Sequence, residues 1–213
     1  SVNSVGNIAI SGHFSDVSMD CDELSIENKD SNGGSIDIFV AVLDSDLNCI
    51  WLNSIGGEDD DVVKELVFND DGTLLLGGSI QDIVYFGSEG TDGTAEDGFV
   101  SKFTNDGTIN WGYRINGVGD QSVNAIFINS DNTILIGGDS DNKAEIDGGG
   151  ENKSSLKAGF MLKLDDNANI EWLSTSSIVN HNNHNVPTYD GWSLFNLDER
   201  PNGEYRNFRI QLG

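Results

Sequence analysis

Two short stretches of acidic and amide side chains have the alternate spacing of a cation site. Their oxygen-bearing residues are Asp44, Asp46 and Asn48 in the first stretch and Asp165, Asn167 and Asn169 in the second. Calcium takes roughly six to eight oxygen ligands, and alternate residues of a tight turn can direct carboxylate and amide oxygens at one centre. The sequence therefore predicts calcium as the candidate cofactor, with these residues as ligands. The alternative is an ordinary Asx-rich turn, because neither stretch completes the EF-hand pattern.

A run of four adjacent carboxylates, Glu58 to Asp61, follows the glycine pair Gly56-Gly57. Adjacent carboxylates repel one another unless cations or solvent screen their charge. The stretch about sixty residues later, 117–120, carries a single acid, so the run is not repeated. We expect a solvated loop here, with a metal-binding rim as the alternative.

Linear signatures of catalysis are absent from the sequence. There is no Gly-x-Ser-x-Gly elbow, no Gly-Lys-Ser/Thr phosphate loop and no His-Glu-x-x-His zinc motif. The sequence thus predicts a protein that is not an enzyme. A glycan-active enzyme remains an alternative, because carboxylate pairs for glycoside cleavage are brought together by folding and leave no linear signature.

The only two cysteines, Cys21 and Cys49, are too far apart in sequence for a zinc or redox motif. They can form one disulfide in an oxidising compartment, or both remain reduced.

The charge balance restricts the partners. Eleven basic residues against 36 acidic ones give a formal net charge of −25. Such a surface repels nucleic acid and anionic lipid, since binding either requires Lys and Arg. No apolar run approaches the ~18 residues of a membrane span, so neither nucleic-acid binding nor membrane insertion is expected.

The elements that must position these residues repeat about every sixty residues. The repeat is clearest in two aromatic series, Phe39, Phe99 and Phe160, and Trp51, Trp111 and Trp172. Short apolar runs separated by Asn, Asp and Gly indicate strands and hairpin turns rather than helices, with four strands in the complete middle unit. We expect the aromatic series to form the core between units. The glycine pairs at 77–78 and 137–138 indicate places where a side chain would obstruct a bulge or a neighbouring backbone.

The predicted fold class is all-β, a β-propeller-like array of four-stranded antiparallel blades, with about three blades and a C-terminal β-hairpin tail. Residues 1–176 form the repeat domain, with units of about 1–55, 56–115 and 116–176, and the first unit lacks its opening strand. Residues 177–213 are an Asn-rich loop and a hairpin that either closes the propeller or starts a further module.

The repeat resembles the bacterial SBBP family, named for seven-bladed β-propellers. The resemblance rests on Gly77-Gly78, Asp97-Gly98-Phe99-Val100, Asn105-Asp106-Gly107 and Trp111, and it extends over about residues 5–176. It implies a secreted or surface-exposed module with varied ligands.

The sequence thus predicts a non-catalytic extracellular or cell-surface module for adhesion, surface assembly or ligand binding, with a protein or a glycan as partner. The variable loops, residues 15–36, 80–96 and 139–157, are the expected functional surface, because repeat scaffolds keep the blades and vary the loops. A structural subunit that self-assembles into fibres by strand donation is a further alternative.

Overall fold

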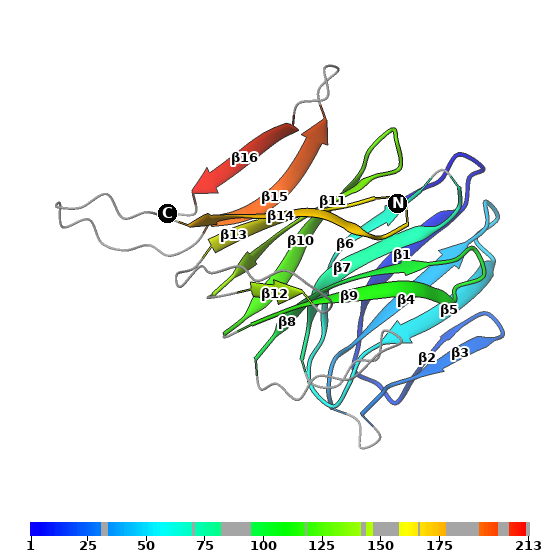
Figure 1. The fold of residues 1–213 in the computed structure, drawn as a ribbon. Coiled ribbons are helices and arrows are strands. Elements are labelled where there is room, and N and C mark those ends of the chain that lie inside the picture. The colour runs from blue at the N-terminus through cyan, green and yellow to red at the C-terminus, as the bar shows by residue number, and fades with distance from the viewer. Residues whose placement is uncertain are drawn as a thin grey trace.

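The computed structural model describes residues 1–30, 34–69, 71–81, 95–117, 119–141, 144–146, 158–165, 167–177, 192–199 and 205–211, and the structural statements below concern these residues. Every regular element in these ranges is a β-strand, so the all-β prediction is confirmed (Figure 1). The same ranges contain no helix of the length and hydropathy needed to cross a membrane.

Three antiparallel sheets follow one another along the chain. The first has the order β1-β4-β5, with β1 at Ile8–Phe14, β4 at Asp37–Leu43 and β5 at Cys49–Ile55. Between β1 and β4 the chain forms a separate hairpin of β2 (Ser18–Cys21) and β3 (Leu24–Glu27), which contacts β5.

The second and third sheets each contain a complete four-strand unit. The second consists of β6 (Val62–Phe68), β7 (Leu74–Ile80), β8 (Asp97–Phe103) and β9 (Ile109–Gly117), with β12 (Ala144–Ile146) added alongside β9. The third consists of β10 (Gln121–Ile128), β11 (Ile134–Ser140), β13 (Ala158–Leu164) and β14 (Ile170–Ser177).

The three units share one register. Strands β1 and β4 pair from Ile8↔Leu43, and the corresponding pairs in the next units are Leu74↔Phe103 and Ile134↔Leu164. The last strand of each unit pairs with its neighbour through a bulge at the corresponding place. The sequence repeat is therefore a structural repeat. As predicted, the first sheet contains only the last three strands of the unit.

The glycine pairs have the role that the sequence predicts. A Cβ on Gly78 would overlap the carbonyl oxygen of Val62, and one on Gly138 would overlap that of Ser122. Both carbonyls belong to strands that bulge next to the glycine, β6 at Lys64 and β10 at Asn124. Only glycine allows the bulged backbone to approach this closely.

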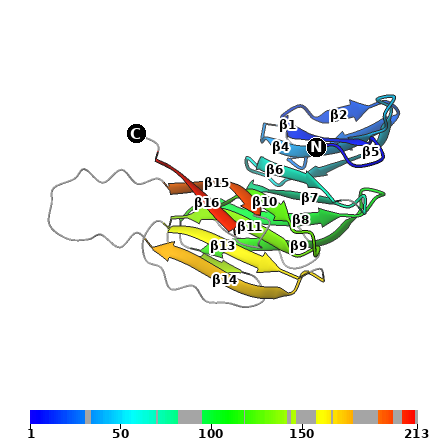
Figure 2. The ribbon, with the colours of Figure 1, turned by 90° about the horizontal axis from the view of Figure 1, so that it is seen from above.

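The sheets stack face to face, and each contact between neighbouring sheets holds a hydrophobic core (Figure 2). We call the contact of the first and second sheets the first junction, and that of the second and third sheets the second junction. The first core includes Ile38, Val40, Leu74, Leu76 and Phe99, and the second includes Leu75, Val100, Ile126, Ile136 and Phe160.

The aromatic series follows this stacking only in part. Phe99 and Phe160 are buried, and Trp51 is buried and stacks on Phe103 of the next unit with ring centroids 5.8 Å apart. Trp172 is 38% exposed, so the prediction that it is a core residue is wrong. The reason is its position on β14, the outer strand of the third sheet, because β15 (Trp192–Glu199), the described strand that lies on this sheet, contacts the inner strands β10, β11 and β13.

The C-terminal hairpin, β15 (Trp192–Glu199) and β16 (Tyr205–Gln211), lies against the third sheet. β15 contacts β10, β11 and β13, just as β10 contacts β6, β7 and β8 of the second sheet. Among the described strands the hairpin pairs only with itself, and no pairing with β1 that would close a ring is seen. Whether residues 177–213 form a separate module stays a prediction.

Candidate functional site

The first predicted calcium ligands lie in the turn between β4 and β5, where they form a hydrogen-bonded loop. The Asp44 carboxylate accepts bonds from the main-chain N–H groups of Asp46 and Asn48, each at 2.9 Å, and from the side-chain amide of Asn48 at 2.9 Å. Asp46 thus contributes its main chain here. These hydrogen bonds hold the pKa of Asp44 below its usual value, with the side-chain bond from Asn48 as the largest cause.

The second set lies in the corresponding turn between β13 and β14 and has the same arrangement. Asp165 accepts from the main-chain N–H of Asn167 at 2.9 Å, from that of Asn169 at 2.7 Å and from the Asn169 side chain at 2.9 Å. The side-chain bond from Asn169 is the largest cause that lowers the pKa of Asp165.

In each turn, hydrogen bonds hold the first aspartate and the last asparagine together. The asparagine side chains direct their N–H₂ donors at the carboxylate, whereas a cation needs their oxygens. Among the described residues no group of three or more His, Cys, Asp or Glu side chains is arranged to hold a metal ion. Calcium binding stays a prediction, and the hydrogen bonds by themselves account for an Asx-rich turn.

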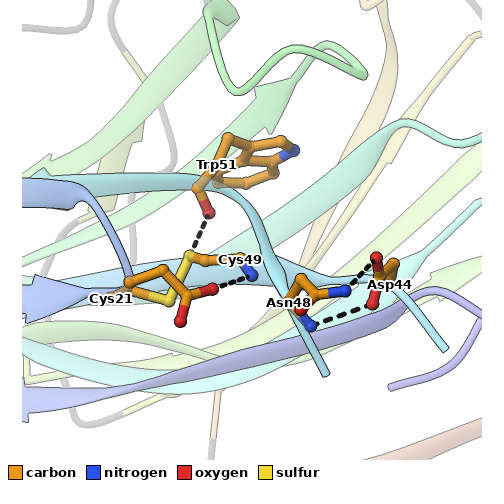
Figure 3. The surroundings of a disulfide bond; sticks show 6 residues. Cys21, Asp44, Asn48, Cys49 and Trp51 are labelled. Atoms are coloured by element: carbon orange, nitrogen blue, oxygen red, sulfur yellow. Dashed lines mark hydrogen bonds between the residues drawn. A yellow bond between two sulfur atoms is a disulfide. The ribbon is translucent and has the colours of Figure 1, made fainter. Parts of the chain in front are cut away.

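The two cysteines are joined, and the bond ties the β2–β3 hairpin to β5 (Figure 3). Cys21 is the last residue of β2 and Cys49 the first of β5, with their Cα atoms 5.9 Å apart. The Asp22 carboxylate accepts a hydrogen bond from the main-chain N–H of Cys49 at 2.6 Å. The inserted hairpin, part of the variable loop 15–36, is thus fixed to the first sheet at two adjacent residues.

Large apolar side chains are exposed next to this disulfide. Leu24, which pairs with Cys21, is 38% exposed, and Leu47 and Ile50, on either side of Cys49, are 63% and 44% exposed. We call Leu24, Leu47 and Ile50 the disulfide patch. Acidic residues Asp22, Glu23 and Asp46 neighbour its members in sequence. Exposed apolar side chains and acidic residues thus follow each other closely in the sequence around the disulfide, and Ile50 also lines the cavity described next.

A cavity of about 200 Å³ opens near the first junction. Its lining includes the polar residues Asn3, Asp71 and Asn105 and the aromatic residues Trp51 and Phe68. Trp51 is only 7% exposed and packs on Phe103, so its ring serves the core and does not form an open platform for a sugar.

Two buried carboxyl groups lie at the first junction, and Asp61 is the more strongly perturbed. Its side chain is fully buried and accepts hydrogen bonds from the main-chain N–H groups of Gly57 and Gln81, each at 3.0 Å. Burial raises the pKa of Asp61 to about 8, and the charges of Asp37 and Asp60 act in the same direction. At neutral pH this group therefore holds a proton.

The second buried carboxyl group, Asp37, is the first residue of β4. Its Oδ2 atom accepts a hydrogen bond from the main-chain N–H of Lys29 at 2.6 Å, while Oδ1 has no hydrogen-bond partner among the described residues. Burial raises the pKa of Asp37, and the charge of Asp30 adds to this, against the opposing effect of Lys29. Two acids at one junction thus share an environment that disfavours their charged forms.

Sequence reasoning assigned Asp61 to a solvated acidic run, and this prediction is wrong. Asp61 precedes β6, and its main-chain N–H donates to the carbonyl of Ile36 at 2.7 Å, which holds its side chain inside the junction. Asp60 accepts from the N–H of Ile36 at 2.9 Å. The repeat offered one signal in the sequence. Asp61 aligns with Gln121, an uncharged residue at the start of an apolar strand.

The remaining sequence candidates are placed in part. His13 lies on β1, where its Nε2 atom accepts a hydrogen bond from the main-chain N–H of Val63 at 3.1 Å. The pair His181 and His184 lies outside the described residues, as do most of the variable loops 80–96 and 139–157.

Comparison with known proteins gives no family assignment. No protein-family model matches this chain, and no curated protein sequence matches it either. The resemblance to the SBBP repeat therefore stays a prediction, carried by the residues of the repeat itself.

Proposed function

We propose that this chain is a non-catalytic, extracellular β-propeller-type module that binds a partner protein at a cell surface through the disulfide patch. The propeller-type arrangement is supported by three units in one register that stack through continuous cores. Such a scaffold keeps its sheets constant and varies the loops that join them.

The observation that carries this proposal is the fixed β2–β3 hairpin. The hairpin lies in the loop between the second and third strand places of the unit, and in the second and third units this loop lies mostly outside the described residues, apart from β12. A disulfide that closes a loop of this length contributes about 3–4 kcal/mol in the chain-entropy model. A rigid loop that exposes apolar side chains is typical of a recognition surface.

The chemistry of the patch favours a protein over a glycan. Leucine and isoleucine side chains offer no hydrogen bonds to sugar hydroxyls, while they pack well against apolar side chains of a protein. The neighbouring acids and the net charge of −25 favour a partner with a basic surface. The disulfide supports an extracellular location, because such bonds persist in oxidising compartments.

A binding panel tests the proposal. The purified chain is screened by surface plasmon resonance against immobilised cell-surface proteins and printed glycans. We expect a protein ligand whose affinity falls at least tenfold in Leu24→Ser/Leu47→Ser and weakens with added salt. The matched control is Val17→Ser, which changes an exposed apolar residue at the other end of the β2–β3 hairpin and should leave the affinity unchanged.

Other outcomes would change the assignment. Binding that the patch variant leaves intact would remove the disulfide patch from the proposal. A glycan hit with release of reducing sugar, lost on changing one carboxylate, would favour the glycan-active enzyme. A ladder of multiples of 23.0 kDa in light scattering would favour the fibre-forming subunit.

A further inference from the structure

Apolar side chains form much of the wall of the cavity near the first junction. Val42 and Trp51 line it as buried residues, with 3% and 7% of their surface exposed. Val5 and Ile50 line it from the surface and are 76% and 44% exposed. Phe68 adds an aromatic side chain from the second sheet. The cavity thus joins buried apolar surface to apolar surface that a partner can reach.

Three of these wall residues have equivalents in the later units. Val5 is the third residue of the turn before β1, whose two main-chain hydrogen bonds recur in the turns before β7 and β11. Val42 pairs with Trp51 next to the bulge of the last strand, and Ile50 is the extra residue of that bulge. The equivalents of Val5, Val42 and Ile50 are Asp71, Lys102 and Asn110 in the second unit and Asp131, Lys163 and Glu171 in the third.

The equivalent residues are all polar or charged, and some of them pair with each other. In the second unit Oδ2 of Asp71 lies 4.0 Å from Nζ of Lys102. In the third unit Nζ of Lys163 lies 2.9 Å from Oε2 of Glu171. The first unit has apolar residues at all three places.

The exchange to apolar residues serves the cavity better than it serves the core. Val5 and Ile50 stay largely exposed, so burial in the folded chain does not account for their apolar character. Valine is shorter than lysine, so Val42 also leaves room that a lysine side chain would take. Both effects favour the entry of an apolar group from outside.

The polar side chains of the cavity are engaged within the turns that line it. Oδ1 of Asn3 accepts hydrogen bonds from the main-chain N–H groups of Val5 at 3.2 Å and Asn7 at 2.9 Å. The side-chain amide of Asn105 donates to the carbonyl oxygen of Asp71 at 3.4 Å. These bonds favour an apolar occupant over a sugar. Pockets for drug-sized ligands measure roughly 300–1,000 Å³, so a cavity of about 200 Å³ suits a single side chain.

The position of the cavity favours an occupant from another protein. Ile50 belongs both to the cavity wall and to the disulfide patch, so the two surfaces are continuous. The longer stretches outside the described residues meet the described strands elsewhere. Stretches 31–33, 82–94 and 147–157 join strand ends on the side of the sheets opposite to the cavity turns, and 178–191 and 200–204 adjoin β14 and the C-terminal hairpin.

We propose that the cavity receives one aliphatic side chain, of leucine or methionine size, from the partner protein that binds the disulfide patch. This inference rests on the proposed function and adds the anchor residue of that partner. Side chains that fill a pocket in this way carry much of the binding energy of an interface. The net charge of −25 favours basic residues next to the anchor in the partner.

The probe for the cavity is N-acetyl-leucine-methylamide, added to the whole protein with isotope-labelled methyl groups. We expect the methyl signals of Val42 and Ile50 to shift and to saturate with a dissociation constant in the millimolar range. N-acetyl-asparagine-methylamide has the same shape with a polar end and is the matched control probe. It should bind about tenfold more weakly, because its amide gains nothing from apolar walls.

Two variants test the cavity from the protein side. Val5→Asp/Val42→Lys gives the first unit the residues of the second, which holds Lys102 with its side chain 14% exposed, and should weaken the leucine probe about tenfold. Val5→Ser changes an exposed residue alone, so it remains informative where the double variant fails to fold, and should weaken the probe about threefold. Leu47→Ser, in the disulfide patch but not in the cavity wall, is the control and should leave probe binding unchanged.

The inference and the proposed function fail in different ways. Equal affinity of the two probes, or no shift at Val42 and Ile50, would overturn the cavity site whatever the panel of cell-surface proteins gives. A protein ligand from the panel should lose affinity in Val5→Ser, and unchanged affinity would overturn the assignment of the anchor to that partner. Probe binding with no protein ligand in the panel would overturn the proposed function and the partner as source of the side chain. A doubled mass that Val5→Ser returns to 23.0 kDa would show a second copy as the source and also overturn the assignment.

Discussion

The two junctions hold neighbouring sheets together with the same pair of hydrogen bonds, one between main-chain groups and one to an aspartate side chain. At the first, Ile36 donates to Asp60 and accepts from the N–H of Asp61. At the second, Glu96 donates to Asp120 at 3.3 Å and accepts from the N–H of Gln121 at 2.8 Å. The corresponding residues lie one repeat apart, so the backbone arrangement belongs to the repeat itself.

The charges inside the two junctions differ. At the second junction Asp97 accepts from Arg114 through Nε at 2.8 Å and lies 2.7 Å from its Nη2, and Gln121 is neutral. At the first junction the corresponding residues are Asp37, Ser54 and Asp61, which place two carboxyl groups at the junction with no arginine. The comparison teaches that one backbone scaffold tolerates a paired charge at one junction and, at the other, two buried acids of which Asp61 is protonated at neutral pH.

The largest effect should come from breaking the ion pair at the second junction. Arg114→Met removes the guanidinium that is paired with the buried Asp97 carboxylate, which costs about 3–5 kcal/mol of unfolding free energy. Urea denaturation at pH 7 measures the loss.

The double variant Asp97→Asn/Arg114→Met is the control, because it removes both charges together. It should recover most of the stability that Arg114→Met loses. A single variant as stable as the unmodified protein would show that the pair does not hold the second junction.

The first junction should respond to pH in a way that the second does not. Because the pKa of Asp61 is raised from 3.8 to about 8 in the folded protein, the folded state holds a proton that the unfolded chain releases between these values. The contribution of Asp61 to the free energy of unfolding is therefore greatest below pH 3.8 and falls as the pH rises toward 8. Between pH 6 and pH 8 the loss is about 2–3 kcal/mol, measured by urea denaturation across that range.

Asp61→Asn should flatten this pH dependence, because asparagine carries no titrating proton. Asp37, whose pKa burial also raises, remains in place and contributes to the residual slope. An unchanged slope in this variant would assign the titration to another group.

Much of the fold was predictable because its determinants are local. The apolar runs, the Asn-Asp-Gly turns and the glycine pairs act within a few residues, so four strands per unit followed from the sequence. The register of Phe103 with Ile109 recurs as Leu43 with Cys49 and Leu164 with Ile170, because the turns between these strands have the same length.

The site was less predictable because its determinants lie across the junctions. An acidic run gives no sign that Asp61 turns inward, since its partner Ile36 lies in another unit. The sequence could not decide whether Cys21 and Cys49 are bonded, because the distance between them depends on where the β2–β3 hairpin lies. The exposure of Trp172 depends on what stacks against the last sheet, which the residue itself does not encode.

A smaller effect should follow from giving the first junction the chemistry of the second. Ser54 lies on β5 opposite Phe39, as Arg114 lies on β9 opposite Phe99. Ser54→Arg should supply a cation to Asp37 and stabilise the chain at pH 8 by about 1 kcal/mol, with a flatter pH profile. Ser54→Met, of similar length and no charge, is the control and should give no gain.

The smallest effect should come from removing the aspartate of the β4–β5 turn, Asp44, or that of the β13–β14 turn, Asp165. We expect the two changes to have equal effects. Their hydrogen bonds are the same, so Asp44→Ala and Asp165→Ala should each lower the melting temperature by on the order of 2 °C and to the same extent. If the turns are held by hydrogen bonds alone, millimolar calcium or chelator will not move the melting temperature of the unmodified protein. A calcium-dependent rise that both variants abolish would instead establish the predicted calcium ligands, and it would show that the oxygen donors rearrange around the cation.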